Sequence, residues 1–529
     1  MSTATQSLAT PHVGLIDRLR VRASQSTGRL VVLMASILSV SSFAFYYSQG
    51  LTLIYGDAVS HLNIARRVVD NISPGLAHLG TIWLPLPHLL MLPLVWIDPL
   101  WNSGLAGIWV SMVAYVVAAS AIYGAVAEIT EDKAAGLVGA FAFMASPSML
   151  YMQTTPMTES LMIGTSTMAL YFLVKWGKSL ETRYLHMVGA AIFLAVQSRY
   201  DGWFYVPAVA LCILLVAMLA RGNAFAEASG LAFLSFGAYS IFLWMFYNWL
   251  ITGNPLNFAL GTGSASWFAQ QQAAGGVGIL KGDLVLTAIT YGWAMVDVIG
   301  WVALAALLSG LLAYLYRHGF RGKYLAGYIF LTPIAFNIVS LFIGQSVLTV
   351  GQMPPYGLYN VRYGLMALPA AAFFAGCLAS GSQWKKVLLV IVILFQATLF
   401  WPIRSMPVVA EPLQNMVTTE KAQDVAAVLR SRYEGGKMLI STDNDNLIFF
   451  LDLPFKNIIY EGNHPYWDIS LEHPETYATW IVVRDTQAGG DTLYRAIRAN
   501  PELASDFDLV YENAPYRLYR NRHKAKPIP

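Results

Sequence analysis

The chain has 529 residues, of which 56% are hydrophobic and only 12% are charged, and its formal net charge is +3. Soluble proteins carry roughly 25% charged residues, and disordered chains combine few apolar residues with much charge, so both classes are excluded. The small net charge also gives no support for a nucleic-acid partner, which would require a strongly basic surface.

The acidic residues divide the chain into parts of different character. The last 119 residues hold 17 of the 30 Asp and Glu residues, and the 410 residues before them hold the other 13. Three regions are therefore predicted: a cytoplasmic N-terminal segment over 1–29, a membrane body over 30–405, and a water-soluble tail over 411–529.

Long apolar runs predict about eleven membrane-spanning helices, because a span needs about 20 mostly apolar residues. The apolar stretch 83–97 is short and contains three prolines, so it is predicted to be an interfacial or re-entrant segment. The fold class is therefore an α-helical polytopic membrane protein with a C-terminal α/β domain. The predicted spans are 30–50, 104–127, 134–150, 157–175, 184–199, 203–220, 226–251, 287–314, 325–346, 361–380 and 386–402.

The distribution of positive charge predicts the orientation of these spans. With a cytoplasmic N-terminus, 14 of the 20 Lys and Arg residues before position 411 fall in cytoplasmic loops, as the positive-inside rule requires. The protein is thus expected in the cell's inner or plasma membrane, with its C-terminal domain on the extracytoplasmic side.

The first outer loop is rich in candidate functional groups. Asp57 is predicted to cap an amphipathic helix that runs to about Asp70 and lies on the membrane surface, with Arg66 and Arg67 on its polar side. Asp57 and His61 are four residues apart, so they share one face of this helix. The competing interpretation is a simple N-cap on a surface helix without a catalytic role.

The later outer loops add more charged residues on the same side of the membrane. Glu159 opens a span, Arg199 and Asp201 flank a tyrosine, and Lys281 ends a long polar loop. The alternative interpretation of Glu159 is a helix-start acid, and that of Arg199 with Asp201 is a simple ion pair. No acidic set lies in the middle of the spans and no internal repeat is found, which disfavours an ion pathway or a transporter. The remaining outer residues of interest are Tyr359, Arg362 and Tyr363.

Five motifs follow one another along residues 30–405: Gly56-Asp57, the segment around Pro85 and Pro87, Thr158-Glu159-Ser160, Arg199-Tyr200-Asp201-Gly202-Trp203 and Asn360-Val361-Arg362-Tyr363. In the order of these motifs the chain resembles the GT-C superfamily of integral-membrane glycosyltransferases. It is most similar to the bacterial branch that uses polyprenyl-phosphate sugars, which includes protein mannosyltransferases and aminoarabinose transferases. Two departures stand out: Ala58 follows Asp57 where two adjacent acids are common, and the tryptophan-rich motif of oligosaccharyltransferases is absent, which argues against transfer of whole oligosaccharides to asparagine.

The resemblance implies an inverting glycosyltransferase that moves a sugar from a polyprenyl-phosphate donor to an acceptor hydroxyl of a lipid, glycan or protein. Asp57 would be the base, and Glu159 would position the sugar or share that role. Arg362 and Arg199 would bind phosphate. The other substrate-binding candidates are His61, Asp201, Lys281, Tyr359 and Tyr363, with Arg66 and Arg67 as weaker ones that contact lipid headgroups.

No cofactor is predicted, although the superfamily leaves a divalent metal open, with Asp57, Glu159 and His61 as available ligands. The sequence spacing of these three residues gives no independent support for a metal. Two alternatives to the glycosyltransferase remain at this stage: a transporter or flippase for lipid-linked substrates, and a polymerase or ligase that uses lipid-linked glycans.

The tail is predicted to be a small α/β domain that covers the catalytic face and helps to choose the acceptor. A helix is expected over 419–433, strands over 437–441 and 479–484, and a hairpin formed by 507–511 and 516–519. The run Asp443-Asn444-Asp445-Asn446 is typical of a calcium or sugar site, but a solvated turn is the favoured interpretation.

Overall fold

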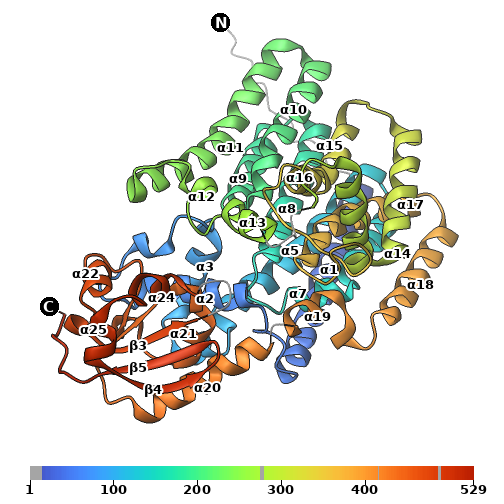
Figure 1. Ribbon diagram of the computed structural model, residues 1–529. Coiled ribbons are helices and arrows are strands. Elements are labelled where there is room, and N and C mark those ends of the chain that lie inside the picture. The colour runs from blue at the N-terminus through green and yellow to red at the C-terminus, as the bar shows by residue number, and fades with distance from the viewer. Residues whose placement is uncertain (1–14, 275–278, 415, 486–489, 529) are drawn as a thin grey trace, which may run out of the picture.

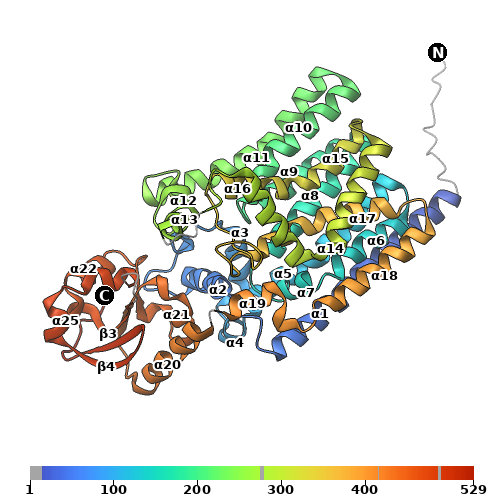
Figure 2. The same ribbon diagram turned by 45° about the vertical axis from the view of Figure 1, so that its right-hand side comes forward.

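The computed structural model describes residues 15–274, 279–414, 416–485 and 490–528. A large helical body is joined to a smaller C-terminal region that contains the sheet, and helix α2 (Gly56–Val69) lies between the two (Figures 1 and 2). This C-terminal region corresponds to residues 416–528 of the predicted tail, and from here on the word tail refers to these residues.

Within the described residues, seven helical segments are long and apolar enough to cross a membrane. Each of the eleven predicted spans contains helix, but four of them contain no helix that is both long enough and apolar enough to cross a membrane. For example, α6 (Lys133–Met144) has 12 residues, which gives a length of about 18 Å against a hydrocarbon core of about 30 Å. The seven segments are Ser26–Ser48 in α1 (Leu15–Ser48), α5 (Leu105–Thr130), α10 (Asp201–Arg221), α11 (Asn223–Thr252), α14 (Leu284–His318), Gly322–Phe342 and Val361–Ala379.

The other four predicted spans correspond to α6, α8 (Glu159–Ser179), α9 (Thr182–Val196) and α18 (Gln383–Leu399). The proline-rich stretch 83–97 forms the helix α3 (Leu86–Val95) of 10 residues. A helix of this length reaches only about 15 Å, so the prediction that it does not cross the membrane as a regular helix agrees with its size.

The remaining elements of the body are short. The segment Gly322–Phe342 consists of η2 (Gly322–Tyr324), α15 (Leu325–Tyr328), η3 (Ile329–Leu331) and α16 (Thr332–Phe342), and Val361–Ala379 consists of η4 (Val361–Ala367) and α17 (Leu368–Ala379). The others are η1 (Leu76–Leu79), α4 (Asp98–Asn102), α7 (Pro147–Met152), α12 (Asn257–Leu260), α13 (Ala265–Ala274), η5 (Ile403–Ser405) and α19 (Pro407–Leu413).

Close packing of α5 against α8 places the start of α8 inside the body. A Cβ built on Gly164 would lie 2.7 Å from the backbone carbonyl oxygen of Ala114, so only glycine allows this approach. Small residues at such contacts let helix backbones come together where lipid offers no hydrophobic driving force. Glu159, the first residue of α8, is held in the protein interior as a result.

The tail is built on a five-stranded mixed sheet with the strand order β2-β1-β3-β5-β4. Strand β1 pairs in parallel with β2 and β3, whereas β5 pairs antiparallel with β3 and β4. The predicted helix, strands and hairpin are all present. The bounds are α20 (Met416–Arg432), β1 (Lys437–Ile440), η6 (Thr442–Asn444), α21 (Asp445–Leu451), η7 (Phe455–Asn457), β2 (Ile458–Ile459), α22 (Tyr466–Glu472), α23 (Pro474–Tyr477), β3 (Ala478–Arg484), α24 (Thr492–Ile497), α25 (Pro501–Asp506), β4 (Phe507–Asn513) and β5 (Tyr516–Asn521).

Helix α2 differs from the prediction in its cap and in its surroundings. Tyr55 occupies the N-cap position without a side-chain cap hydrogen bond, and Asp57 lies in the first turn instead. The apolar residues Val59 and Leu62 are buried in a cluster that they share with residues of α20 and α21. The apolar side of the helix is therefore covered by protein, because the tail packs against it, and not by the membrane surface as predicted.

The two arginines of α2 are buried in ion pairs. The expectation that they contact lipid headgroups is therefore wrong. Arg66 pairs with Asp70 at 3.2 Å and with Asp98 at 2.5 Å. Arg67 donates to Asp445 at the start of α21. The pair between Arg67 and Asp445 joins two segments that are 378 residues apart. The division into a membrane body and a separate domain remains a prediction.

We expect the Arg67→Met variant to loosen the tail from α2. The substitution keeps most of the side-chain volume but leaves the Asp445 carboxylate buried without its cation, and breaking a buried pair in this way costs about 3–5 kcal/mol. Hydrogen exchange of the α21 amides should accelerate, while the exposed control Arg404→Met should leave it unchanged. Equal exchange in both variants would show that the ion pair does not hold the tail.

Candidate active site

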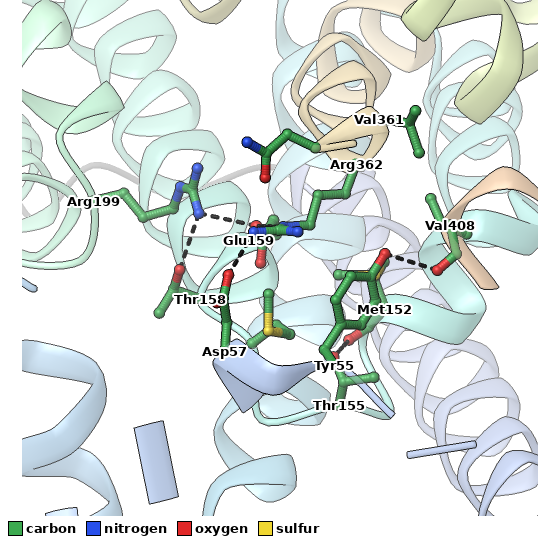
Figure 3. Close-up of polar contacts among 12 residues, drawn as sticks. Tyr55, Asp57, Met152, Thr155, Thr158, Glu159, Arg199, Val361, Arg362 and Val408 are labelled. Atoms are coloured by element: carbon green, nitrogen blue, oxygen red, sulfur yellow. Dashed lines mark hydrogen bonds and ion pairs between the residues drawn. The ribbon is translucent and has the colours of Figure 1, made fainter. Parts of the chain in front are cut away.

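Arg362 lies at the centre of a cluster of carboxylates. Its guanidinium group uses all three nitrogens: Nη2 donates to Asp57 Oδ2 at 2.6 Å, Nε to Glu159 Oε1 at 3.1 Å, and Nη1 to Glu411 Oε1 at 3.1 Å. Figure 3 shows Arg362 reaching down toward Asp57 and across Glu159. Residues from α2, α8, η4 and α19 thus meet at one side chain, so three predicted site residues are brought together.

Arg199 forms the second positive centre of the cluster. Its Nη1 donates to Glu159 Oε1 at 2.9 Å and to Thr158 Oγ1 at 3.1 Å, and its Nε donates to Asp201 Oδ2 at 2.7 Å (Figure 3 shows the first two contacts). The predicted pairing of Arg199 with Asp201 is confirmed. Desolvation opposes the charge, but the neighbouring Asp201 and Glu159 carboxylates outweigh it and raise the pKa of Arg199.

A tight turn between α9 and α10 presents Arg199 to this cluster. A Cβ built on Gly202 would lie 2.3 Å from the carbonyl oxygen of Ala195. No side chain other than the hydrogen of glycine fits at that distance. The Arg199-Tyr200-Asp201-Gly202 motif therefore encodes both the ion pair and the turn that holds it.

Glu159 links the two arginines and is completely buried. Its Oε1 accepts from both Arg199 and Arg362, whereas its Oε2 is buried and has no hydrogen-bond partner in the described part of the chain. A carboxylate shared by two guanidinium groups fixes their separation. This arrangement favours a positioning role for Glu159 over the role of a base.

Asp57 is the member of the cluster that faces outward. Its side chain is 44% exposed, against 10% for Arg362 and 0% for Glu159. A base that accepts a proton from a substrate must be reachable by that substrate. Asp57 meets this condition, and it already sits at hydrogen-bond distance from a buried cation.

Two tyrosine rings surround the guanidinium groups. The Arg362 guanidinium carbon lies 5.1 Å from the Tyr55 ring centre and 5.8 Å from the Tyr363 ring centre, and that of Arg199 lies 5.8 Å from Tyr363. Tyr55 is fixed in turn by a 2.7 Å hydrogen bond from its hydroxyl to the Val408 carbonyl (Figure 3). Tyr363 is therefore a cation–π partner of both guanidinium groups.

Of the remaining predicted substrate-binding residues, Lys281 lies apart from these contacts. It packs against Gly344 and, among the described residues, makes no ion pair with the cluster. Tyr359 forms a backbone bridge with Thr349, is 39% exposed, and lies near Tyr363. The long loop that ends at Lys281 therefore does not bring its positive charge to Arg362.

His61 is buried and contacts a second histidine instead of Asp57. Its Nδ1 lies 2.9 Å from His88 Nε2, and its ring packs against Trp83 with 4.5 Å between ring centres. Burial, followed by the positive charges of Arg199 and Arg362, lowers the pKa of His61 to about 3. The imidazole of His61 is therefore engaged by α3, although His61 and Asp57 lie on the same helix.

We expect the thermal stability of the protein to fall as the pH is lowered from 7.5 to 4.5, partly because of His61. The unfolded chain protonates this residue near pH 6.5, whereas the folded chain keeps it neutral down to about pH 3. Stability therefore rises with pH in this window, by up to about 1.4 kcal/mol per pH unit. His61→Gln should flatten the dependence of melting temperature on pH, whereas the exposed control His464→Gln should not; identical curves would contradict the assignment.

Glu411 is a site residue that sequence reasoning missed. Its two oxygens accept from the backbone amides of Asn360 and Val361 as well as from Arg362. Burial raises its pKa, against the lowering effect of Arg362. In the sequence, Glu411 is the first acid of the predicted tail over 411–529. Its position just after the last apolar run was the signal that it lies at the membrane face.

The three residues considered as metal ligands do not form a metal site. Oxygens of Asp57 and Glu159 are bonded to Arg362, and His61 Nδ1 is bonded to His88. Over the described ranges, no group of three or more His, Cys, Asp or Glu side chains is arranged to hold a metal ion.

Comparison with known proteins gives a match to one family model and several solved structures with a similar fold. Residues 100–250 match the model of the dolichyl-phosphate-mannose-protein mannosyltransferase family. The fold is similar to that of ArnT from Cupriavidus metallidurans in the apo state, with 13% identity, a TM-score of 0.57, and coverage of 96% of this chain and 100% of ArnT. No curated protein matches the chain.

Two further solved structures share this fold. ArnT from Cupriavidus metallidurans bound to undecaprenyl phosphate gives 13% identity and a TM-score of 0.55, over 93% of this chain and 99% of that one. The Archaeoglobus fulgidus oligosaccharyltransferase in complex with Zn and sulfate gives 11% identity and a TM-score of 0.51, over 91% of this chain and 79% of that one. These findings confirm the predicted resemblance: residues 100–250 match a mannosyltransferase family, and the chain as a whole has a fold similar to that of ArnT.

Proposed function

We propose that the protein transfers a sugar, with inversion, from a polyprenyl-phosphate donor to an acceptor hydroxyl at the extracytoplasmic membrane face. The donor class is supported by the dolichyl-phosphate-mannose description of the matching family and by the undecaprenyl phosphate bound to the similar ArnT. The extracytoplasmic location is supported by the excess of Lys and Arg in the loops predicted to lie on the cytoplasmic side of the membrane.

The observation that carries this proposal is the contact between Asp57 and Arg362. A partly exposed carboxylate occupies one nitrogen of a buried guanidinium group at 2.6 Å. A phosphate group has the same charge sign and a matching oxygen geometry, so it can replace that carboxylate on Nη2. Donor binding then does two things at once: it places the phosphate on Arg362 and releases Asp57 as a free base.

The reaction requires one bond to form and one to break. The acceptor hydroxyl oxygen bonds to the anomeric carbon from the side opposite the phosphate, while Asp57 takes the hydroxyl proton. The bond between the anomeric carbon and the phosphate oxygen breaks, and its electron pair leaves with polyprenyl phosphate. Arg362, with Arg199 beside it, stabilises the negative charge that develops on this leaving group.

The remaining carboxylates hold the two arginines in place. Glu159 bridges Arg199 and Arg362, Asp201 binds Arg199, and Glu411 ties Arg362 to the backbone at Asn360. With these contacts fixed, neither guanidinium has to reorganise when the phosphate arrives, which is the condition for strong electrostatic stabilisation.

The direct test is turnover by the purified full-length protein in lipid nanodiscs. Undecaprenyl-phosphate mannose and undecaprenyl-phosphate aminoarabinose serve as donors, and lipid A, methyl α-mannoside and a Ser/Thr peptide serve as acceptor probes. Release of undecaprenyl phosphate from a monophosphate donor is expected. Consumption of a lipid-diphosphate donor alone would overturn the proposal in favour of a polymerase or ligase.

A further inference from the structure

One stripe of α2 is occupied by the tail. Gly56, Ser60, Asn63 and Arg67 recur at intervals of four, three and four residues, so they lie on one face of the helix. Asn63 Nδ2 donates to the Asp445 backbone oxygen at 2.9 Å. Arg67 donates to the Asp445 carboxylate, and Ser60 lies against it as well. Asp445 thus anchors the start of α21 along this stripe.

Asn446, the residue after Asp445, lies beside the start of α2. A Cβ built on Gly56 would be 3.6 Å from Asn446 Nδ2 and 3.8 Å from its Oδ1. Gly56 directly precedes Asp57, the outward-facing carboxylate of the active site. In both views of the fold, α21 lies next to α2 on the side of the tail (Figures 1 and 2).

Asn446 differs from the rest of the Asp443–Asn446 run in having no partner. Asp443 accepts from the Thr492 hydroxyl and Asn444 donates to Asp491, so both are used inside the tail. Asp445 is used by the anchor. The half-buried side chain of Asn446 makes no hydrogen bond with any residue that the structure describes. Three of the four side chains of the run are thus bonded to other residues of the protein, and within the described ranges the run forms no metal-binding group.

We propose that Asn446 is a substrate-binding residue whose carboxamide hydrogen-bonds a hydroxyl group of the reacting sugar or of the acceptor beside Asp57. A carboxamide offers two donors and an acceptor, which suits hydroxyl groups of either orientation. This inference rests on the proposed function, because it takes Asp57 to be the point of transfer. It also makes the tail a part of the active site, with Asp445 as its anchor.

The experiment compares Asn446→Ala with the control Asn500→Ala, since the Asn500 side chain donates to the Glu472 carbonyl within the tail. In one arm, the Kd of undecaprenyl-phosphate mannose and of bare undecaprenyl phosphate is measured in nanodiscs. In the other, the KM for the hydroxyl probe that the wild type uses is measured, together with kcat.

Loss of one uncharged hydrogen bond should weaken binding by about 3- to 10-fold. A higher Kd for the sugar-bearing donor, with the Kd of bare undecaprenyl phosphate unchanged, identifies the hydroxyl as one of the donor sugar. A higher KM for the acceptor probe, with an unchanged donor Kd, identifies it as one of the acceptor. Constants equal to those of Asn500→Ala in both arms would overturn the inference. Absence of turnover in the wild type would overturn the proposed function instead.

Discussion

The Asp57→Asn variant is expected to release undecaprenyl phosphate about 10²–10⁴ times more slowly than the wild type. The range is the usual contribution of a positioned general base. An asparagine oxygen at position 57 still accepts a hydrogen bond from Arg362 Nη2, where Asp57 now lies at 2.6 Å, so the melting temperature should change little. The initial rate of product release at saturating donor measures the effect.

The matched control is Asp98→Asn. Like Asp57, Asp98 pairs with an arginine, Arg66, at 2.5 Å. Its side chain is 68% exposed and lies outside the Arg362 cluster. Its substitution should leave turnover within twofold of the wild type. A similar loss in both variants would remove the special role assigned to Asp57.

Arg362→Lys is expected to reduce kcat/KM by about 10²–10³-fold, the size of effect seen when one donor to a developing negative charge is removed. A lysine ammonium is a point charge and cannot replace a planar group that binds Asp57, Glu159 and Glu411 through three separate nitrogens. The variant should also have a higher KM for the donor, because the phosphate loses a fork-shaped partner. Steady-state kinetics with a donor titration measures both changes.

Arg66→Lys is the control for this second substitution. Arg66 is equally buried and also pairs with two acids, Asp70 and Asp98. Both lysine variants should therefore lower the melting temperature. Only Arg362→Lys should raise the KM for the donor. An unchanged donor KM in Arg362→Lys would mean that the phosphate binds elsewhere.

Much of the active site could be predicted because its residues stand at chain positions that a membrane fixes. Glu159 begins α8, Arg362 lies in η4 at the start of its span, and Arg199 lies in the turn before α10. Charged groups at the ends of spans on one side of a membrane fall in one thin layer. The predicted convergence of these groups, and the pair of Arg199 with Asp201, follow from that geometry.

The parts that escaped prediction depend on contacts between distant segments. The burial of α2 and the pairing of Arg67 with Asp445 require the tail to fold back over the body. The contact of His61 with His88 requires α3 to pack against α2. No periodicity within one segment encodes such contacts. The same limit applies to Glu411, whose role depends on a bend of the chain after the last span.

The proposed mechanism depends on an exchange of partners at Arg362, and a structure of the protein bound to undecaprenyl phosphate in a nanodisc tests this exchange most directly. We predict a phosphate oxygen within about 3.2 Å of Arg362 Nη2, with the Asp57 carboxylate released from its present 2.6 Å contact. A lipid phosphate bound elsewhere, with the contact between Asp57 and Arg362 intact, would contradict the account.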